Sequence, residues 1–234
     1  MPQPYWPLWG LREPVSSGTH FVAFLWSVYA TLLLWRLCRG ERSKQLSLGV
    51  FGLSMISLYA ASSSYHAVRF TPEHLRIFQL LDHSAIYGLI AGTYTPAFVV
   101  LLQPGLRKRL LIGGMWLLAG IGIAGKWLLP GTPYWVTMLL YFGLGYGGMV
   151  PVLEFKRTVG LRGLAWAFAG GLCYTLGGLA DLMKWPDFYP GVFAHHELFH
   201  LFAMAGTACH FIFMMLYVVP FADYTGESRV PVLA

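Results

Sequence analysis

The 234-residue chain is 56% hydrophobic, 16% aromatic and only 11% charged. Soluble globular proteins contain about 25% charged residues, so this composition excludes a soluble domain and predicts an all-α integral membrane protein. A net charge of +6 would suggest nucleic-acid binding in a soluble protein. Here the basic residues lie in short segments between apolar runs, where they set membrane orientation, and we expect no nucleic-acid partner.

Seven apolar runs are each long enough to cross a bilayer, which takes about 20 residues in a helix. No soluble domain or long linker fits between any two of them. Residues 1–234 are therefore predicted to form a single membrane domain, a seven-transmembrane helix bundle. In chain order, the predicted spans cover residues 19–37, 46–68, 79–102, 109–129, 134–153, 161–183 and 192–219.

The basic residues are divided unequally between the two sides of this bundle. Most of the 16 Lys and Arg residues fall on the side that holds the loop between the first two spans. The positive-inside rule then predicts a cytoplasmic C-terminus and an N-terminus on the outer side of the plasma membrane.

The seventh predicted span contains the motif H-E-x-x-H at residues 196–200. In zinc metalloproteases, the two histidines of this motif bind zinc from one helix face and the glutamate activates a water. The extended protease pattern requires a glycine three residues after the second histidine and a third histidine six residues after it. Ala203 and Gly206 occupy those positions, so the protease interpretation lacks its third ligand within this helix.

Polar residues of two other spans are expected at the same membrane surface. Ser62 and His66 lie four residues apart at the end of the second span, and Asp82 lies at the start of the third. The end of an even-numbered span and the start of an odd-numbered one share a surface, so these residues can meet His196 and His200. Three neutral imidazoles with an open fourth position form the ligand set of a catalytic zinc. We therefore predict that His66, His196 and His200 bind Zn²⁺ near Asp82.

The remaining polar residues receive structural interpretations. His210 lies about 15 Å along the helix from His200, too far to bind the same ion, and is expected to be packed and hydrogen-bonded. Asp181 and Lys184 end the sixth span on the side of the site, where they are expected to form an interfacial pair rather than the alternative, a vestibule of the site. Four further histidines are expected in loops or at the membrane interface: His20, His74, His83 and His195.

Three segments carry a resemblance to a known family: "SSSYH", "LDHSAIYGLIAGTYTPAF" and "FAHHELFHLFAMAGTACHF". They resemble, in the same order, segments of the bacterial hemolysin III family, which belongs with the progestin and adipoQ receptors and is more distantly similar to the alkaline ceramidases. The resemblance implies a seven-helix fold in a bacterial inner membrane, with zinc on His66, His196 and His200. It also implies that Asp82 holds the zinc-bound water and that Ser62 assists it, whereas Glu197 falls where the adiponectin receptors have an uncharged amide.

Three functions remain open at this point. The first is a zinc-dependent hydrolase of a lipid amide or ester, with a membrane lipid as substrate, Asp82 as general base and Ser62 as a hydrogen-bond donor. The second is a membrane receptor or sensor in which zinc is structural. The third is a hemolysin or pore, although the spans contain no charged stripe that would line a conduit.

Overall fold

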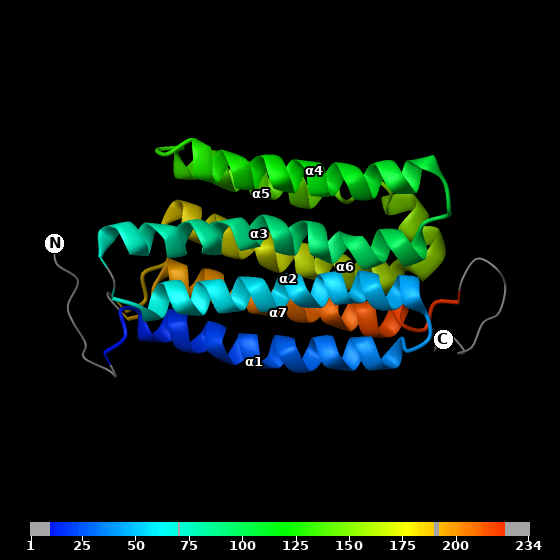
Figure 1. The fold of residues 1–234 in the computed structure, drawn as a ribbon, viewed down its shortest axis with the longest axis horizontal. Coiled ribbons are helices and arrows are strands. Elements are labelled where there is room, and N and C mark those ends of the chain that lie inside the picture. The colour runs from blue at the N-terminus through cyan, green and yellow to red at the C-terminus, as the bar shows by residue number, and fades with distance from the viewer. Residues whose placement is uncertain (1–9, 70, 190–191, 223–234) are drawn as a thin grey trace.

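The computed structural model describes residues 10–69, 71–189 and 192–222, and these residues form a bundle of long helices (Figure 1). Seven α-helices are followed by one π-helical turn. In chain order they are α1 (Pro14–Leu37), α2 (Arg42–Ala67), α3 (Pro72–Leu101), α4 (Leu106–Leu128), α5 (Tyr134–Gly147), α6 (Val152–Met183), α7 (His195–Phe213) and η1 (Met214–Val218).

Six of these helices are long and apolar enough to cross a membrane. The exception is α5, which has 14 residues and ends at Gly147, where we expected a span to residue 153. Gly147 and Gly148 weaken the helix at this point, and Pro151 cannot donate a backbone hydrogen bond to continue it. Residues 148–151 therefore form turns rather than a continuation of α5.

Several helices begin well before the predicted spans. Hydropathy marks only the part of a helix that is apolar, whereas α3 begins at Pro72, whose fixed φ suits a first helical turn. The start predicted for the sixth span at residue 161 instead coincides with a break inside α6. Gly160 there has a φ of +69°, a left-handed conformation that a side chain would disfavour.

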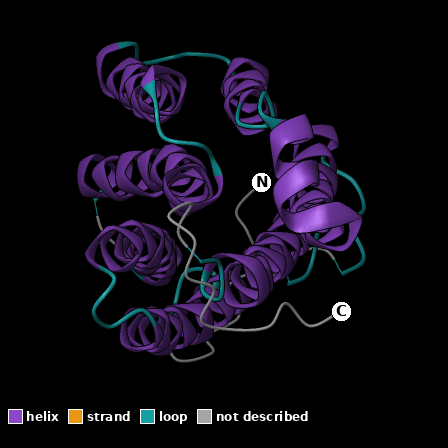
Figure 2. Ribbon diagram, turned by 90° about the vertical axis from the view of Figure 1, so that its right-hand side faces the viewer, coloured by secondary structure: helices purple, strands orange, loops and turns teal. Residues whose placement is uncertain are grey.

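The helices form a closed ring. Each one contacts the next in chain order, and α1 contacts α7; Figure 2 shows the ribbons of this bundle from one end. The start of α1 lies at the end of α2, because the amide of Glu13 donates to the carbonyl of His66. The end of η1 lies at the opposite end of α2, where Lys44 donates to the carbonyls of Val219 and Phe221. The described chain therefore starts and finishes at opposite ends of the bundle.

Close contact between α2 and α3 depends on small residues. A Cβ at Gly92 would lie 2.4 Å from Oγ of Ser54, whereas a Cβ one turn earlier, at Gly88, would meet no atom within 4 Å. Without a hydrophobic driving force between helices in lipid, such close approach is a main source of helix association. The outward face of the ring is apolar, as exposed Leu25, Leu117 and Leu139 illustrate.

Candidate metal centre

Three histidines from two helices meet at one end of the bundle. His66 lies in the last turn of α2, and His196 and His200 lie on the first turns of α7. One ligand nitrogen from each lies within 4.8 Å of the other two. His66 and His200 are almost fully buried, with exposures of 1% and 2%. The structure thus brings together the three histidines that the sequence predicts as metal ligands.

Two of these histidine rings bind a carboxylate at Nδ1. Glu13, directly before α1, binds Nδ1 of His66. Asp181, near the end of α6, lies 3.1 Å from Nδ1 of His196. Such carboxylate partners orient the ring and direct its other nitrogen toward a metal. Burial raises the pKa of Glu13, but the hydrogen bond to His66 and the charges of His66 and Arg12 outweigh it, so the pKa lies below its usual value.

The Nε2 atoms of His66 and His196 have the spacing that one tetrahedral zinc ion requires. Nε2 of His66 lies 3.4 Å from Nε2 of His196. Two nitrogens bound to one tetrahedral zinc at 2.0–2.1 Å would be about 3.3 Å apart. A third imidazole, that of His200, faces both at ring-centroid distances of 4.7 Å. The donor set, its spacing and its carboxylate partners therefore fit a metal ion, and all-imidazole coordination suits zinc among others.

The first helix contributes more to this centre than the sequence indicated. His20 was expected at the interface, but this prediction is wrong: it is 3% exposed within α1. Its ring stacks on His200, with centroids 3.7 Å apart and planes 9° from parallel. Ser16, one turn earlier, donates a hydrogen bond of 2.9 Å to Glu197.

Glu197 has a structural role in this arrangement. Besides the hydrogen bond from Ser16, its carboxylate accepts one of 2.9 Å from the backbone amide of Ala194. This bond satisfies a free amide at the start of α7. The contact with Ser16 joins α7 to α1 beside the histidines, and the contact with Ala194 caps the start of α7.

Asp181 does not form the interfacial pair with Lys184 that we expected. It is 6% exposed and binds the imidazoles of His195 and His196 and the hydroxyl of Tyr134. His195 was expected at the interface and is half-buried through this contact. The sequence signal was available, since an aspartate inside an apolar helix needs a partner in the membrane.

Asp82 and Ser62 lie beside the histidines in a shared cavity. Both are buried, with exposures of 7% and 1%, and their side chains interact with each other. The cavity has a volume of about 620 Å³, and its wall includes Ser62, Asp82, His196 and His200. The polar group predicted at the end of the second span and the start of the third therefore shares one chamber with two of the three histidines.

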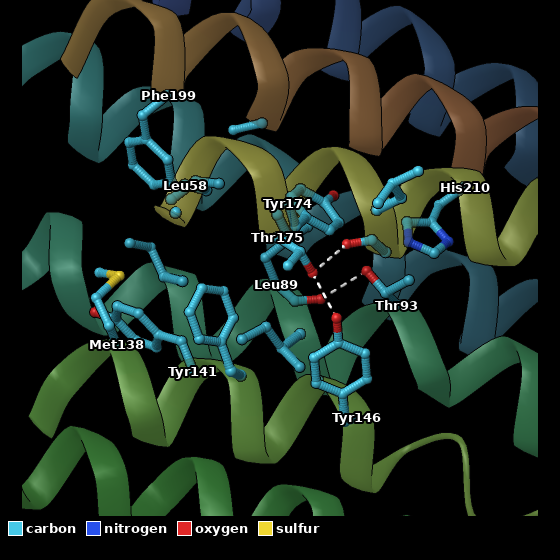
Figure 3. A pocket seen from close by; sticks show the side chains of 18 of the residues that line it. Leu58, Leu89, Thr93, Met138, Tyr141, Tyr146, Tyr174, Thr175, Phe199 and His210 are labelled. Atoms are coloured by element: carbon cyan, nitrogen blue, oxygen red, sulfur yellow. Dashed lines mark hydrogen bonds between the residues drawn. The ribbon is translucent and has the colours of Figure 1, made fainter. Parts of the chain in front are cut away.

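The same cavity reaches the outer surface between α5 and α6. Tyr146 of α5 and Phe168 and Leu172 of α6 line it and are also 50 to 58% exposed. Figure 3 shows the interior, with Met138 and Tyr141 of α5 facing Phe199 and Tyr174 across an apolar space. A chamber with a polar end and a lateral opening can admit an amphiphile from the bilayer.

Comparison with known proteins places the chain in a family. A model described as "Haemolysin-III related" matches residues 9–211. Hemolysin-3 of Bacillus cereus is 32% identical over 91% of this chain and 95% of its own length. The Hemolysin-3 homolog of Bacillus subtilis (strain 168) is 30% identical over 89% and 96%. The monocyte to macrophage differentiation factor of Homo sapiens is 27% identical over 88% and 84%. The resemblance seen in the sequence is confirmed.

Proposed function

Given that the chain belongs to the haemolysin-III related family, we propose that it is an intramembrane zinc hydrolase of a lipid amide or ester. The observation that carries the proposal is the position of the histidine cluster, with Asp82, at the buried end of an apolar cavity that opens toward the bilayer. A bound zinc ion supplies a Lewis acid that polarises a carbonyl and acidifies a water.

The residues of the chain have distinct roles in this proposal. Asp82 takes a proton from the attacking water and returns it to the leaving amine or alcohol. Ser62 holds the Asp82 carboxylate in position by a hydrogen bond. Once Asp82 has taken the proton, the single hydroxyl hydrogen of Ser62 is free to be donated to the oxygen on which charge develops. The apolar wall between α5 and α6 binds the acyl chain and excludes water.

We also propose that α5 is a seventh crossing. Tyr134 at its start binds Asp181 near the end of α6, at the end of the bundle that holds the histidines. Glu154, shortly after its end, binds Arg107 at the start of α4, at the opposite end. The chain thus traverses the bundle between Tyr134 and Glu154, and a 14-residue helix extended by turns accomplishes this where the bilayer is locally thinner.

The proposal is tested by hydrolysis assays on the purified full-length protein. We expect release of fatty acid from ceramides or other acyl lipids that stops on chelation and returns with added zinc. Asp82→Asn should reduce turnover by about 10²- to 10⁴-fold while zinc content stays unchanged. Asp187→Asn, at an exposed loop position, is the matched control and should behave as the original protein.

The alternative, a receptor or sensor with structural zinc, gives a different pattern. It predicts no turnover across a broad lipid panel and no effect of Asp82→Asn, while chelation or His200→Ala lowers thermal stability. Absence of metal-dependent release from every lipid in that panel would reject the hydrolase.

A further inference from the structure

The cavity has a second polar end that the proposed chemistry does not use. Its wall continues from His200 to His210, ten residues further along α7 and so about 15 Å away. His210 is 9% exposed and lies in the membrane-spanning part of the helix. Figure 3 shows its imidazole at the opposite side of the cavity from Met138 and Phe199.

His210 is firmly positioned but lacks a hydrogen-bond partner among the residues described, contrary to our expectation. Its ring stacks on Tyr174, with centroids 5.6 Å apart and planes 18° from parallel. One turn before Tyr174 on α6 lies Gly170, where a Cβ would come within 2.6 Å of Nε2 of His210. An unpaired polar group within a membrane is costly and marks a functional site by default.

Three hydroxyl groups line the same cavity as this imidazole, and their hydrogen atoms are already donated. Tyr146 lies 2.8 Å from Oγ1 of Thr175, which itself donates to the carbonyl of Gly171. Thr93 donates to the carbonyl of Leu89, and Figure 3 draws these contacts. Each oxygen retains the capacity to accept another hydrogen bond. This end of the cavity therefore offers several acceptors and one imidazole, which in its neutral form donates from one nitrogen and accepts at the other.

The charges of the cavity wall restrict what this end can bind. Among the described residues that line it there is no lysine or arginine, so a carboxylate or phosphate here would be buried without compensation. A hydroxyl group matches the wall, because it donates to one acceptor and accepts from the imidazole.

We propose that the His210 end of the cavity binds an uncharged hydroxyl group of a lipid, about 15 Å from the polar group that reaches the histidine cluster. The inference rests on the proposed occupancy of the cavity by a lipid. It narrows the substrate class from any acyl lipid to one that is hydroxylated within its chain.

Binding assays on the full-length protein test this assignment without requiring turnover. The probes are a long-chain fatty acid, the same acid with a hydroxyl in the middle of its chain, and an isomer with the hydroxyl beside the carboxyl group. We expect the mid-chain isomer to bind about twofold to tenfold more tightly than the other two, the gain from one net hydrogen bond. His210→Phe, which keeps a ring against Tyr174, should remove the preference, and His210→Gln should retain part of it.

The possible results separate the two proposals. Equal binding of the three acids, or a preference that survives His210→Phe, overturns the His210 assignment and leaves the hydrolase proposal standing. Failure of all three acids to bind overturns the lipid cavity on which both rest. If a variant does not fold, the comparison of the three acids in the unmodified protein still tests whether the cavity prefers a mid-chain hydroxyl group.

Discussion

Glu13 and Asp181 each place a carboxylate on Nδ1 of a histidine in the candidate metal centre. Neither residue belongs to a recognisable motif, and Glu13 precedes the first helix. Each carboxylate comes from a different helix, or from the residue before it, than the histidine that it binds: α1 for α2, and α6 for α7. These contacts therefore fix the rings relative to the bundle as well as orienting their inner nitrogens.

Removal of the Glu13 carboxylate should weaken metal binding. We expect Glu13→Ala to lower zinc affinity by about tenfold to a hundredfold, the usual effect of losing an outer partner of a ligand histidine. Helix α1 should persist, because Glu13 makes no side-chain cap. Competition with a chromogenic chelator measures the change.

Glu154→Ala is the control for this measurement, since Glu154 binds Arg107 at the opposite end of the bundle. Equal zinc affinity in the Glu13 variant and in this control would show that the carboxylate has no part in the metal site.

At the scale of the elements, the site depends on how closely the helices approach. Gly92 lets α3 contact Ser54 of α2, and these two helices carry Asp82 and His66. Gly92→Ala should destabilise the protein by about 1 to 3 kcal/mol, the cost of an overpacked contact. Gly88→Ala, one turn away in open space, should leave stability unchanged or raise it slightly. Unfolding in mild detergent compares them, and equal effects would refute this account of the interface.

At the scale of the whole molecule, the number of crossings determines where the termini lie. Seven crossings place them on opposite sides and six place them on the same side. We expect a fluorescent protein fused to the C-terminus to be bright in the bacterial cytoplasm, and alkaline phosphatase fused to the N-terminus, behind an export signal, to be active outside. Because the fluorescent protein is bright only in the cytoplasm and the phosphatase is active only outside, activity at just one terminus would exclude α5 as a crossing. Inactivity of both reporters would invert the predicted orientation.

The sequence predicted the helical membrane class and the meeting of the three histidines, and particular residues explain why. His196 and His200 are one turn apart, and His66 and Asp82 lie at ends of spans that must share a surface. His20 was misjudged because a lone histidine carries no spacing signal, and its neighbour His200 is 180 positions away. The end of α5 was misjudged because hydropathy continues through Gly147 and Gly148 where helical geometry does not.

The closure of the ring between α1 and α7 has a consequence for biogenesis. Glu13 and His20 are synthesised before His196 and His200. Helices α1 and α7 can therefore make contact only after the helices between them have entered the bilayer. A nascent chain that stops before α7 has the pair of His66 and Glu13 but lacks His196 and His200. Metal binding would thus require completed membrane insertion, and a prematurely terminated chain would leave the translocon without a bound metal.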